Sequence, residues 1–236
     1  MIIVFLCFLV LSPSVVDAQC TCEGSRQTLV DFYTALGGAK WKQTWPVTDA
    51  SSSVCNFYGV TCTSGDITGI DLDRNWLRGT LPASLSSLTR LQSFSVVYNG
   101  VMGTMPAAWG AALSSLTSLN LQDNLMTGSL PSELAGWTSI TYVNIYNNSF
   151  SGTFPSQLSA WTTLQTIYLG YNDFSGTFPP ELSAWSSIQT FSCSGNSFTG
   201  QLPSSWSSWS KLQSFRLSES LIGGTIPSSF SAWSLV

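Results

Sequence analysis

The sequence predicts an α/β solenoid, an elongated domain built by stacking one short unit along an axis. A motif of the form Asn-x-φ-x-Gly-x-φ-Pro, where φ is an apolar residue, recurs from Asn75–Pro82 onward. The motif prolines are 24 or 25 residues apart, and a fixed period in this range is typical of solenoids. The later copies are Asn99–Pro106, Asn124–Pro131, Asn148–Pro155, Asn172–Pro179 and Asn196–Pro203, and a seventh copy runs from Ser220, in place of asparagine, to Pro227.

The N-terminus has the features of a secretory signal peptide, which we place at residues 1–18. Met1–Leu11 form an apolar core, and Val16 and Ala18 are small residues at the usual cleavage positions, so we expect cleavage before Gln19. A membrane anchor is the alternative, because no Lys or Arg precedes the core, but about 11 apolar residues are too few to span a bilayer. We therefore expect a secreted or cell-surface chain without a membrane span of its own.

Composition excludes several classes of function. Only 8% of the 236 residues are charged and the net charge is −4, so we expect no basic surface for nucleic acid or for an anionic membrane. The chain contains no histidine, which excludes a histidine-based triad or proton relay. Without histidine, a tetrahedral zinc site would need all four cysteines of the N-terminal segment as ligands, and we disfavour such a site. We expect a protein that is not an enzyme and that uses no metal and no cofactor.

Residues 19–66 are expected to form an N-terminal cap, because the open end of a stacked solenoid needs a lid. Ser25 is a suitable N-cap for a helix that reaches about Leu36. Gly37-Gly38 should stop this helix. Its apolar stripe is formed by Leu29, Phe32 and Leu36.

The repeating unit resembles the leucine-rich repeat, in which apolar residues in the pattern L-x-x-L-x-L precede an asparagine. Residues 164–187 show the whole pattern, and their G-x-φ-P continuation looks like the plant-type subclass of 24 residues. The resemblance covers residues 67–235. It implies a right-handed superhelix with a parallel concave sheet, short second strands at G-x-φ-P, and 3₁₀ or α turns. The seven predicted repeats are 67–90, 91–115, 116–139, 140–163, 164–187, 188–211 and 212–235.

Near its end the cap contains a segment, Cys55–Cys62, that is similar to the C-x-W-x-G-V-x-C signature of plant-type leucine-rich-repeat caps. Phe57 stands where that signature has tryptophan. The resemblance implies a disulfide between Cys55 and Cys62, which suits a secreted chain. The pairing of Cys20 and Cys22 is open: with each other, with a different partner, or with another chain.

The motif asparagines fall on buried positions of the predicted repeat. A buried amide is costly unless it is hydrogen-bonded, and the resemblance implies a structural ladder that satisfies backbone groups of adjacent turns. Ser220 departs from this column, so we expect a looser last turn. Cys193 falls on a core position, where we expect a buried free thiol. The ladder residues are Asn75, Asn99, Asn124, Asn148, Asn172 and Asn196.

A column of tryptophans recurs in the second half of the repeats. One interpretation is an aromatic ladder that binds sugars. We favour packing in the core, because plant-type repeats carry leucine at this place, and we expect neighbouring serines to accept from the indole N–H groups. The column consists of Trp137, Trp161, Trp185, Trp209 and Trp233.

Tyrosines gather on strand positions that should face outward on the concave sheet. Tyr142 and Tyr146 lie in the fourth repeat, Tyr168 and Tyr171 lie in the fifth, and Tyr98 lies further along the solenoid. The first four should share one patch, and we take all five as candidate ligand-binding residues, since tyrosine offers rigid contact area with a polar tip. The alternative is that aromatic residues simply suit strands.

Asn147-Asn148-Ser149 is an N-x-[ST] sequon, and Asn147 should lie on the exposed side of the ladder. Asn147 is therefore a candidate glycosylation site. A glycan there would crowd the tyrosines, which would argue against a protein ligand at that place.

Two families fit the repeats. Gly176-Thr-Phe-Pro179 with Trp185 looks most like the parasite surface antigens of kinetoplastids, as does the cap with its Phe32-Tyr33 pair. Plant receptor-kinase ectodomains and polygalacturonase-inhibiting proteins are the second match. Both imply an extracellular, non-enzymatic recognition module that binds a protein or glycan through its concave face. The alternatives are a secreted inhibitor of a hydrolase and a passive surface coat antigen.

The C-terminal end leaves one further expectation. The printed chain stops at Val236, the first position of an eighth repeat, and Trp233 and Leu235 should lie on an uncapped end. An exposed apolar surface of this kind is typical of a site that another part of a protein or a partner covers. We expect either a fragment of a longer anchored protein or association with a partner through this end.

Overall fold

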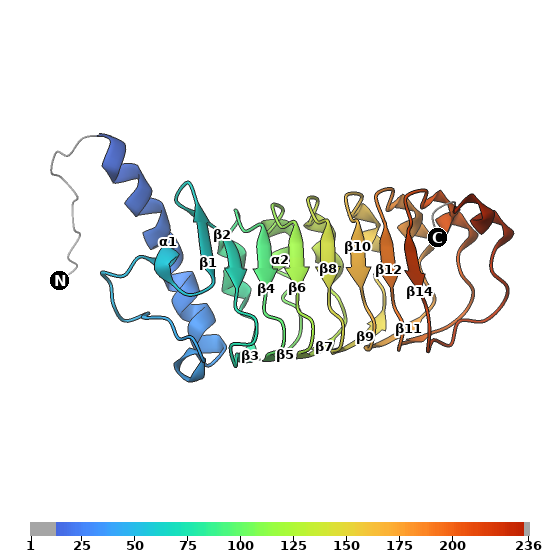
Figure 1. Cartoon of the computed structure of the whole chain (residues 1–236), viewed down its shortest axis with the longest axis horizontal. Coiled ribbons are helices and arrows are strands. Elements are labelled where there is room, and N and C mark those ends of the chain that lie inside the picture. Colours follow the sequence, from blue (N-terminus) through green and yellow to red (C-terminus); the bar gives the residue numbers. More distant parts are fainter. Residues whose placement is uncertain (1–12, 234–236) are drawn as a thin grey trace.

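The computed structural model describes the backbone of residues 13–233 and the side chains of residues 24–233. Figure 1 shows one row of stacked turns, with a helix crossing the N-terminal end. Most of the predicted signal peptide, the side chains of Cys20 and Cys22, and Leu235 lie outside the described residues. Within the described part, no helix is both long enough and apolar enough to cross a membrane.

The cap helix α1 runs from Pro13 to Ala35, so it begins well before the predicted start at Ser25. Ser25 therefore lies inside the helix and is not its N-cap. The physical reason is that Pro13 suits a first helical turn, where its missing N–H costs no hydrogen bond. The helix ends before Gly37, as predicted. Its buried stripe is Leu29, Phe32 and Leu36, also as predicted.

Aromatic rings join the cap to the solenoid. Phe32 lies edge-on to Phe94 of the second repeat, with 6.0 Å between the ring centroids. Trp45 stacks on Phe57, 5.3 Å away, so the phenylalanine fills the place of the expected tryptophan. The predicted disulfide between Cys55 and Cys62 is present. The 3₁₀ turns of the cap are η1 (Gly38–Lys40) and η2 (Val54–Asn56).

One eight-stranded sheet follows the length of the solenoid and forms its concave face. From β2 onward each strand pairs in parallel with the same positions of the next repeat, which confirms the predicted sheet. The first strand was not predicted: β1 belongs to the cap and pairs antiparallel with β2. The strands are β1 (Val60–Thr63), β2 (Asp66–Asp71), β4 (Ser93–Ser95), β6 (Ser118–Asn120), β8 (Tyr142–Asn144), β10 (Thr166–Tyr168), β12 (Thr190–Ser192) and β14 (Ser214–Arg216).

A second sheet of six parallel strands confirms the expected short second strands but not their place. The prediction put them at G-x-φ-P, whereas β7 begins directly after Asn124 and ends at Gly128. Gly128 has φ +78°, which breaks the extended backbone, and Pro131 cannot donate to a ladder. The strands are β3 (Arg78–Thr80), β5 (Gly100–Gly103), β7 (Leu125–Gly128), β9 (Ser149–Thr153), β11 (Asp173–Gly176) and β13 (Ser197–Phe198).

Short turns complete the repeats on the side opposite the concave sheet. The second repeat has one residue more than the others, and it forms the short α-helix α2 (Trp109–Ala112) where other repeats have 3₁₀ turns. The insertion is thus absorbed in one turn and leaves the strand register intact. The 3₁₀ turns are η3 (Ala83–Ser87), η4 (Ser132–Gly136), η5 (Ser156–Ala160), η6 (Pro180–Ala184), η7 (Ser204–Ser208) and η8 (Ser228–Ala232).

The core is continuous along the solenoid, and the motif asparagines lie at its edge. The amide of Asn148 donates to the carbonyls of Leu121 and Ile145 at 2.9 and 3.2 Å, and its oxygen accepts from the N–H of Met126 at 3.0 Å. Each side chain therefore joins two adjacent turns. Ser220 makes a single hydrogen bond, to Leu217 of its own turn.

The tryptophan column packs in the core. Trp137 and Trp161 stack with 5.9 Å between ring centroids and are at most 1% exposed, so they offer no face to a sugar. Their indole partners were wrongly predicted: Trp161 donates to the backbone carbonyl of Leu134 at 2.8 Å, not to a serine. The Leu134 carbonyl also accepts from the backbone N–H of Trp137 at 3.0 Å, so one carbonyl serves both its own turn and the next tryptophan. Cys193 is likewise buried and free, and burial raises the pKa of its thiol.

Candidate functional site on the concave sheet

Tyr142 and Tyr168 face each other across two neighbouring strands. Strands β8 and β10 pair in parallel, with Tyr142 opposite Thr166 and Tyr168 opposite Asn144. Both tyrosines point away from the core and are half-buried, and their ring centroids lie 6.2 Å apart in a T-shaped arrangement. The two rings therefore form one diagonal pair on the concave face.

A second pair lies just beyond the ends of the same strands. Tyr146 and Tyr171 are also T-shaped, with 5.2 Å between ring centroids, and Tyr171 is 45% exposed. Glycine makes room for this pair: a Cβ on Gly195 would lie 3.0 Å from the Tyr171 ring, and a Cβ on Gly170 would lie 3.2 Å from the Tyr146 ring. The four tyrosines of the predicted patch thus lie together as two contacting pairs.

A hydrogen-bonded amide network lies beneath the rings. Asn144 is 4% exposed, and its amide donates to the Gln122 side-chain oxygen at 2.9 Å and to the Tyr142 hydroxyl at 3.2 Å. Its own oxygen accepts from the backbone N–H of Tyr146 at 3.0 Å. Asn144 thereby holds the Tyr142 ring through its hydroxyl and the backbone of Tyr146 through its N–H. Our sequence analysis missed Asn144 and Gln122, although Asn120 and Asn144 repeat at a fixed interval on an outward position and offered a signal.

The hydrogen-bond network extends from Gln122 to Asn147, the predicted glycosylation site. Gln122 donates to Asp123 at 2.7 Å, and the Asn147 amide donates to the other oxygen of Asp123 at 2.5 Å. Asn147 is exposed, next to the buried Asn148, as its position predicted. Its glycosylation stays a prediction, and a glycan would have to attach to an amide nitrogen that already bonds Asp123.

These side chains enclose a hollow of about 300 Å³. We call it the tyrosine hollow; it is lined by Gln122, Tyr142, Asn144, Tyr146, Tyr168, Ser192 and Arg216. Arg216 is exposed and brings a positive charge to one end. Tyr98, the fifth predicted residue, does not line the hollow: its ring lies under the Arg74 guanidinium, 4.2 Å from ring centroid to carbon.

Two phenols of the hollow, those of Tyr142 and Tyr146, have a pKa above the ordinary value for tyrosine. Burial raises the pKa of Tyr142 and outweighs its hydrogen bond to Asn144. Partial burial also raises the pKa of Tyr146, with a smaller contribution from Tyr171. A neutral phenol both donates and accepts hydrogen bonds, so the hollow presents two such groups at physiological pH.

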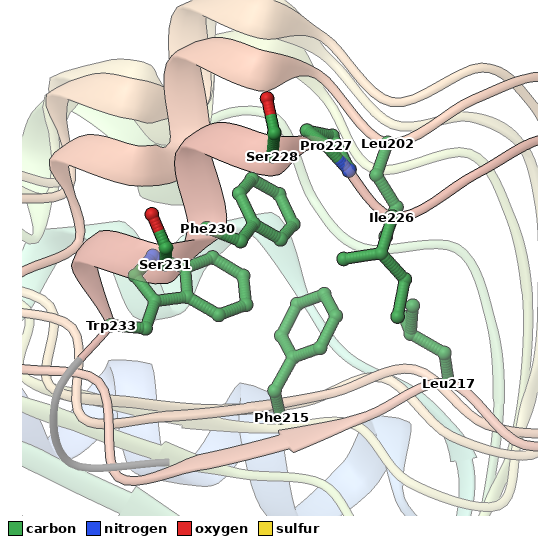
Figure 2. Close-up of a pocket in the computed structure, with 9 residues that line it drawn as sticks. All are labelled: Leu202, Phe215, Leu217, Ile226, Pro227, Ser228, Phe230, Ser231 and Trp233. Atoms are coloured by element: carbon green, nitrogen blue, oxygen red, sulfur yellow. The ribbon is translucent and has the colours of Figure 1, made fainter.

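A second, more apolar hollow of about 620 Å³ opens at the C-terminal end of the described solenoid. Figure 2 shows Phe215 of β14, Phe230 of η8 and Trp233, directly after η8, converging on it. These are repeat positions that the next turn covers elsewhere; Phe191, one repeat before Phe215, is fully buried. The hollow is therefore the packing face that a further turn would fill, and we do not take it as the functional site.

Comparison with known proteins agrees with this architecture. The leucine-rich-repeat family model matches residues 115–137, 139–161, 163–185 and 187–209. The LRR receptor-like serine/threonine-protein kinase GSO2 of Arabidopsis thaliana is 36% identical over 84 residues, which is 36% of this chain and 7% of the kinase. Receptor-like protein kinase 7 of the same plant is 38% identical over 79 residues, 33% of this chain and 8% of that protein.

Solved structures give the same picture. The ectodomain of the Arabidopsis receptor kinase HAESA, in complex with a peptide hormone ligand, superposes with a TM-score of 0.83 at 26% identity, over 92% of this chain and 36% of that one. A chain of the BIR3–SERK2 complex from Arabidopsis thaliana superposes with a TM-score of 0.61 at 30% identity, over 71% of this chain and 90% of that one. The chain thus spans under a tenth of the two kinases above and about a third of the HAESA ectodomain.

Proposed function

We propose that this leucine-rich-repeat solenoid is an extracellular, non-enzymatic recognition module that binds an extended peptide segment of a partner protein in the tyrosine hollow. The observation that carries the proposal is the two tyrosine pairs, which lie above a buried amide, Asn144, that bonds the Tyr142 hydroxyl and the backbone N–H of Tyr146. Rings held in place before binding lose little conformational entropy when a ligand arrives.

The chemistry of the hollow suits a peptide backbone. The Tyr142 hydroxyl and the Gln122 side-chain amide offer hydrogen bonds to peptide groups, and the rings of Tyr146 and Tyr168 offer flat apolar contact. Support also comes from the HAESA ectodomain, which has the same fold and whose solved complex contains a peptide hormone. The polypeptide class of the ligand is our inference for this chain.

Other functions remain open as proposals of lower rank. A glycan would use the same rings and amides. An inhibitor of a hydrolase would use the concave face against an enzyme, and a passive coat antigen would use no ligand at all. The greater likeness to kinetoplastid surface antigens stays a prediction, as does the secreted or cell-surface location of this chain.

The test compares paired variants with the wild-type chain. Peptides are first selected from a random phage-displayed library on the immobilised wild type. Tyr142→Ala with Tyr168→Ala should weaken the selected peptides at least tenfold, because central aromatic contacts carry most of the energy of such interfaces. Tyr58→Ala is the matched control, because Tyr58 is 49% exposed and lies in the cap, away from the hollow.

The outcomes separate the candidates. Equal binding of the selected peptides to the double variant and the wild type would remove the hollow as their site. Binding on a glycan array that the double variant loses, with no peptide enriched, would replace the peptide with a glycan. Enrichment of neither class would favour the passive coat.

A further inference from the structure

Trp76 is unusual among the tryptophans of this chain. It is 68% exposed, whereas eight of the other nine are buried and Trp233 is partly buried. It also has φ +62°, a left-handed conformation that bulky residues rarely adopt. In the other described repeats, the residue directly after the motif asparagine has no positive φ. The fold thus presents one large aromatic side chain to solvent at the junction of cap and first repeat.

Trp76 borders a hollow of about 480 Å³ between the turn after α1 and the first repeat. We call it the cap hollow. Tyr33 forms an aromatic wall, and the turn around Gly37 forms a backbone wall. The walls are fixed to each other, because the Arg78 N–H donates to the Leu36 carbonyl at 3.0 Å. The hollow therefore exists before any ligand binds.

Two cations stand at this hollow without a counter-charge. Lys40 and Arg78 line it and are exposed, and neither forms an ion pair with a carboxylate in the part of the chain whose side chains are described. The Lys42 N–H donates to the carbonyl of Asn75, which brings the backbone of a third basic residue close to Trp76. Six of the eight Lys and Arg residues of this acidic chain lie between residues 26 and 90. Charge complementarity therefore selects an anionic partner here.

The residues that line the cap hollow also indicate which class of anionic partner fits it, an acidic saccharide or an acidic protein segment. The side chains that line the cap hollow offer ammonium, guanidinium and hydroxyl groups, and no amide or carboxylate side chain is among them. Trp, Tyr and Arg are instead the residues enriched at the energetic centres of protein interfaces. We propose that the cap hollow binds an acidic segment of a partner protein, with an apolar or aromatic side chain against Trp76 and carboxylates against Lys40 and Arg78. This inference does not depend on the tyrosine hollow, which lies three repeats away.

The first experiment uses Trp76 as its own reporter. Because the other described tryptophans are buried or partly buried, iodide and caesium should quench mainly the fluorescence of Trp76. Iodide should quench more strongly than caesium in the wild type, because the cations attract it. In the double variant Lys40→Glu, Arg78→Glu, caesium should quench more strongly than iodide. Trp76→Ala should remove most of the quenching by either ion. Arg90→Glu with Lys211→Glu changes net charge equally and should leave the order intact.

The second experiment measures binding with defined probes. The acetylated, amidated peptide Glu-Asp-Phe-Glu-Asp should protect Trp76 from iodide at millimolar concentration, and the peptide Lys-Arg-Phe-Lys-Arg should not. The Lys40→Glu, Arg78→Glu variant should bind the acidic peptide at least tenfold more weakly than the matched control variant does. Near-ultraviolet circular dichroism checks that each variant is folded.

Three results would overturn the proposal. Equal protection by both peptides would show contact without charge selection. Protection by a galacturonate oligomer, and not by the acidic peptide, would assign the hollow to an acidic saccharide. An unchanged iodide preference in the Lys40→Glu, Arg78→Glu variant would show that these cations do not set the local potential. Failure of the peptide selection on the tyrosine hollow would leave all three measurements unaffected.

Discussion

Asparagine has different roles at adjacent positions of the same repeat. The Asn148 side chain turns inward and bonds two neighbouring turns of backbone. The Asn147 side chain turns outward, with φ +53°, and bonds Asp123 on the concave face. The left-handed backbone at this position rotates the chain so that two consecutive amides point in opposite directions. Both residues are asparagines, so burial and not residue type decides how much each side chain contributes to the free energy of unfolding.

Replacement of Asn148 by alanine should destabilise the chain strongly. It would leave the N–H of Met126 buried without a partner, and it would remove one of the two amides that donate to the carbonyl of Leu121. An unsatisfied buried polar group costs about 1–3 kcal/mol, so we expect the free energy of unfolding to fall by about 3 kcal/mol. Urea unfolding followed by circular dichroism measures this change.

Asn147→Gly is the matched control for that substitution. Glycine accepts the positive φ of this position without strain. Only the exposed hydrogen bond to Asp123 is lost, so the free energy of unfolding should change by about 0.5 kcal/mol or less. Similar losses in the two variants would contradict the assignment of the stability to the inward ladder.

At the scale of elements, a single covalent link organises the end of the cap. The disulfide joins η2 to β1, and β1 in turn pairs with the first strand of the solenoid. Trp45 packs against the same segment and donates to the carbonyl of Tyr58 at 2.8 Å. The cap strand is thereby held in the antiparallel register that closes the sheet edge, which would otherwise expose unpaired backbone groups.

Removal of the disulfide should lower stability without changing the fold. Cys55→Ser with Cys62→Ser opens a short loop, and restraint of an unfolded loop of this size contributes about 2–3 kcal/mol. We expect the midpoint of urea unfolding to fall by the corresponding amount. Cys193→Ala is the control for the loss of a free thiol. If a reducing agent lowered the stability of the Cys55→Ser, Cys62→Ser variant as much as that of the wild type, the Cys55–Cys62 bond would not be the source of the lost stability.

At the scale of the whole molecule, stability should vary along the axis. Each turn of a solenoid contacts only its neighbours, so the hydrogen bonds within and beside one turn set its local stability. The seventh repeat lacks the ladder amide, and the described residues include no second strand in it. Its side chains line the open apolar hollow of Figure 2. These features together predict local opening at this end.

Hydrogen exchange should reveal that gradient. In this chain, the amides of Leu221 and Gly223 should exchange faster than those of Met126 and Phe150, which the ladder protects. Ser220→Asn should slow exchange in the last turn, because its amide would reach the Phe198 N–H that the shorter serine does not bond. Deuterium uptake by mass spectrometry resolves these segments. Uniform protection along the chain would contradict a stability gradient.

The features that depend on the repeat period could be predicted from the residues alone. A spacing of 24 residues places the same position of each repeat at the same point of the next turn, so the parallel sheet, the inward asparagines and the adjacency of Tyr142 and Tyr168 follow from it. The helical stripe of the cap followed from helical spacing in the same way, and the disulfide followed from resemblance to known caps. These features need only the local backbone geometry of one repeat.

Contacts between different parts of the chain could be seen only in the folded protein. The indole partners are carbonyls of the preceding turn, and the Tyr142 hydroxyl accepts from the buried Asn144 amide. Tyr98 lies with Arg74 instead of joining the hollow. Trp76 acquires its hollow because the turn after α1 lies against the first repeat. Side-chain directions across such junctions depend on packing between residues that the repeat pattern does not relate.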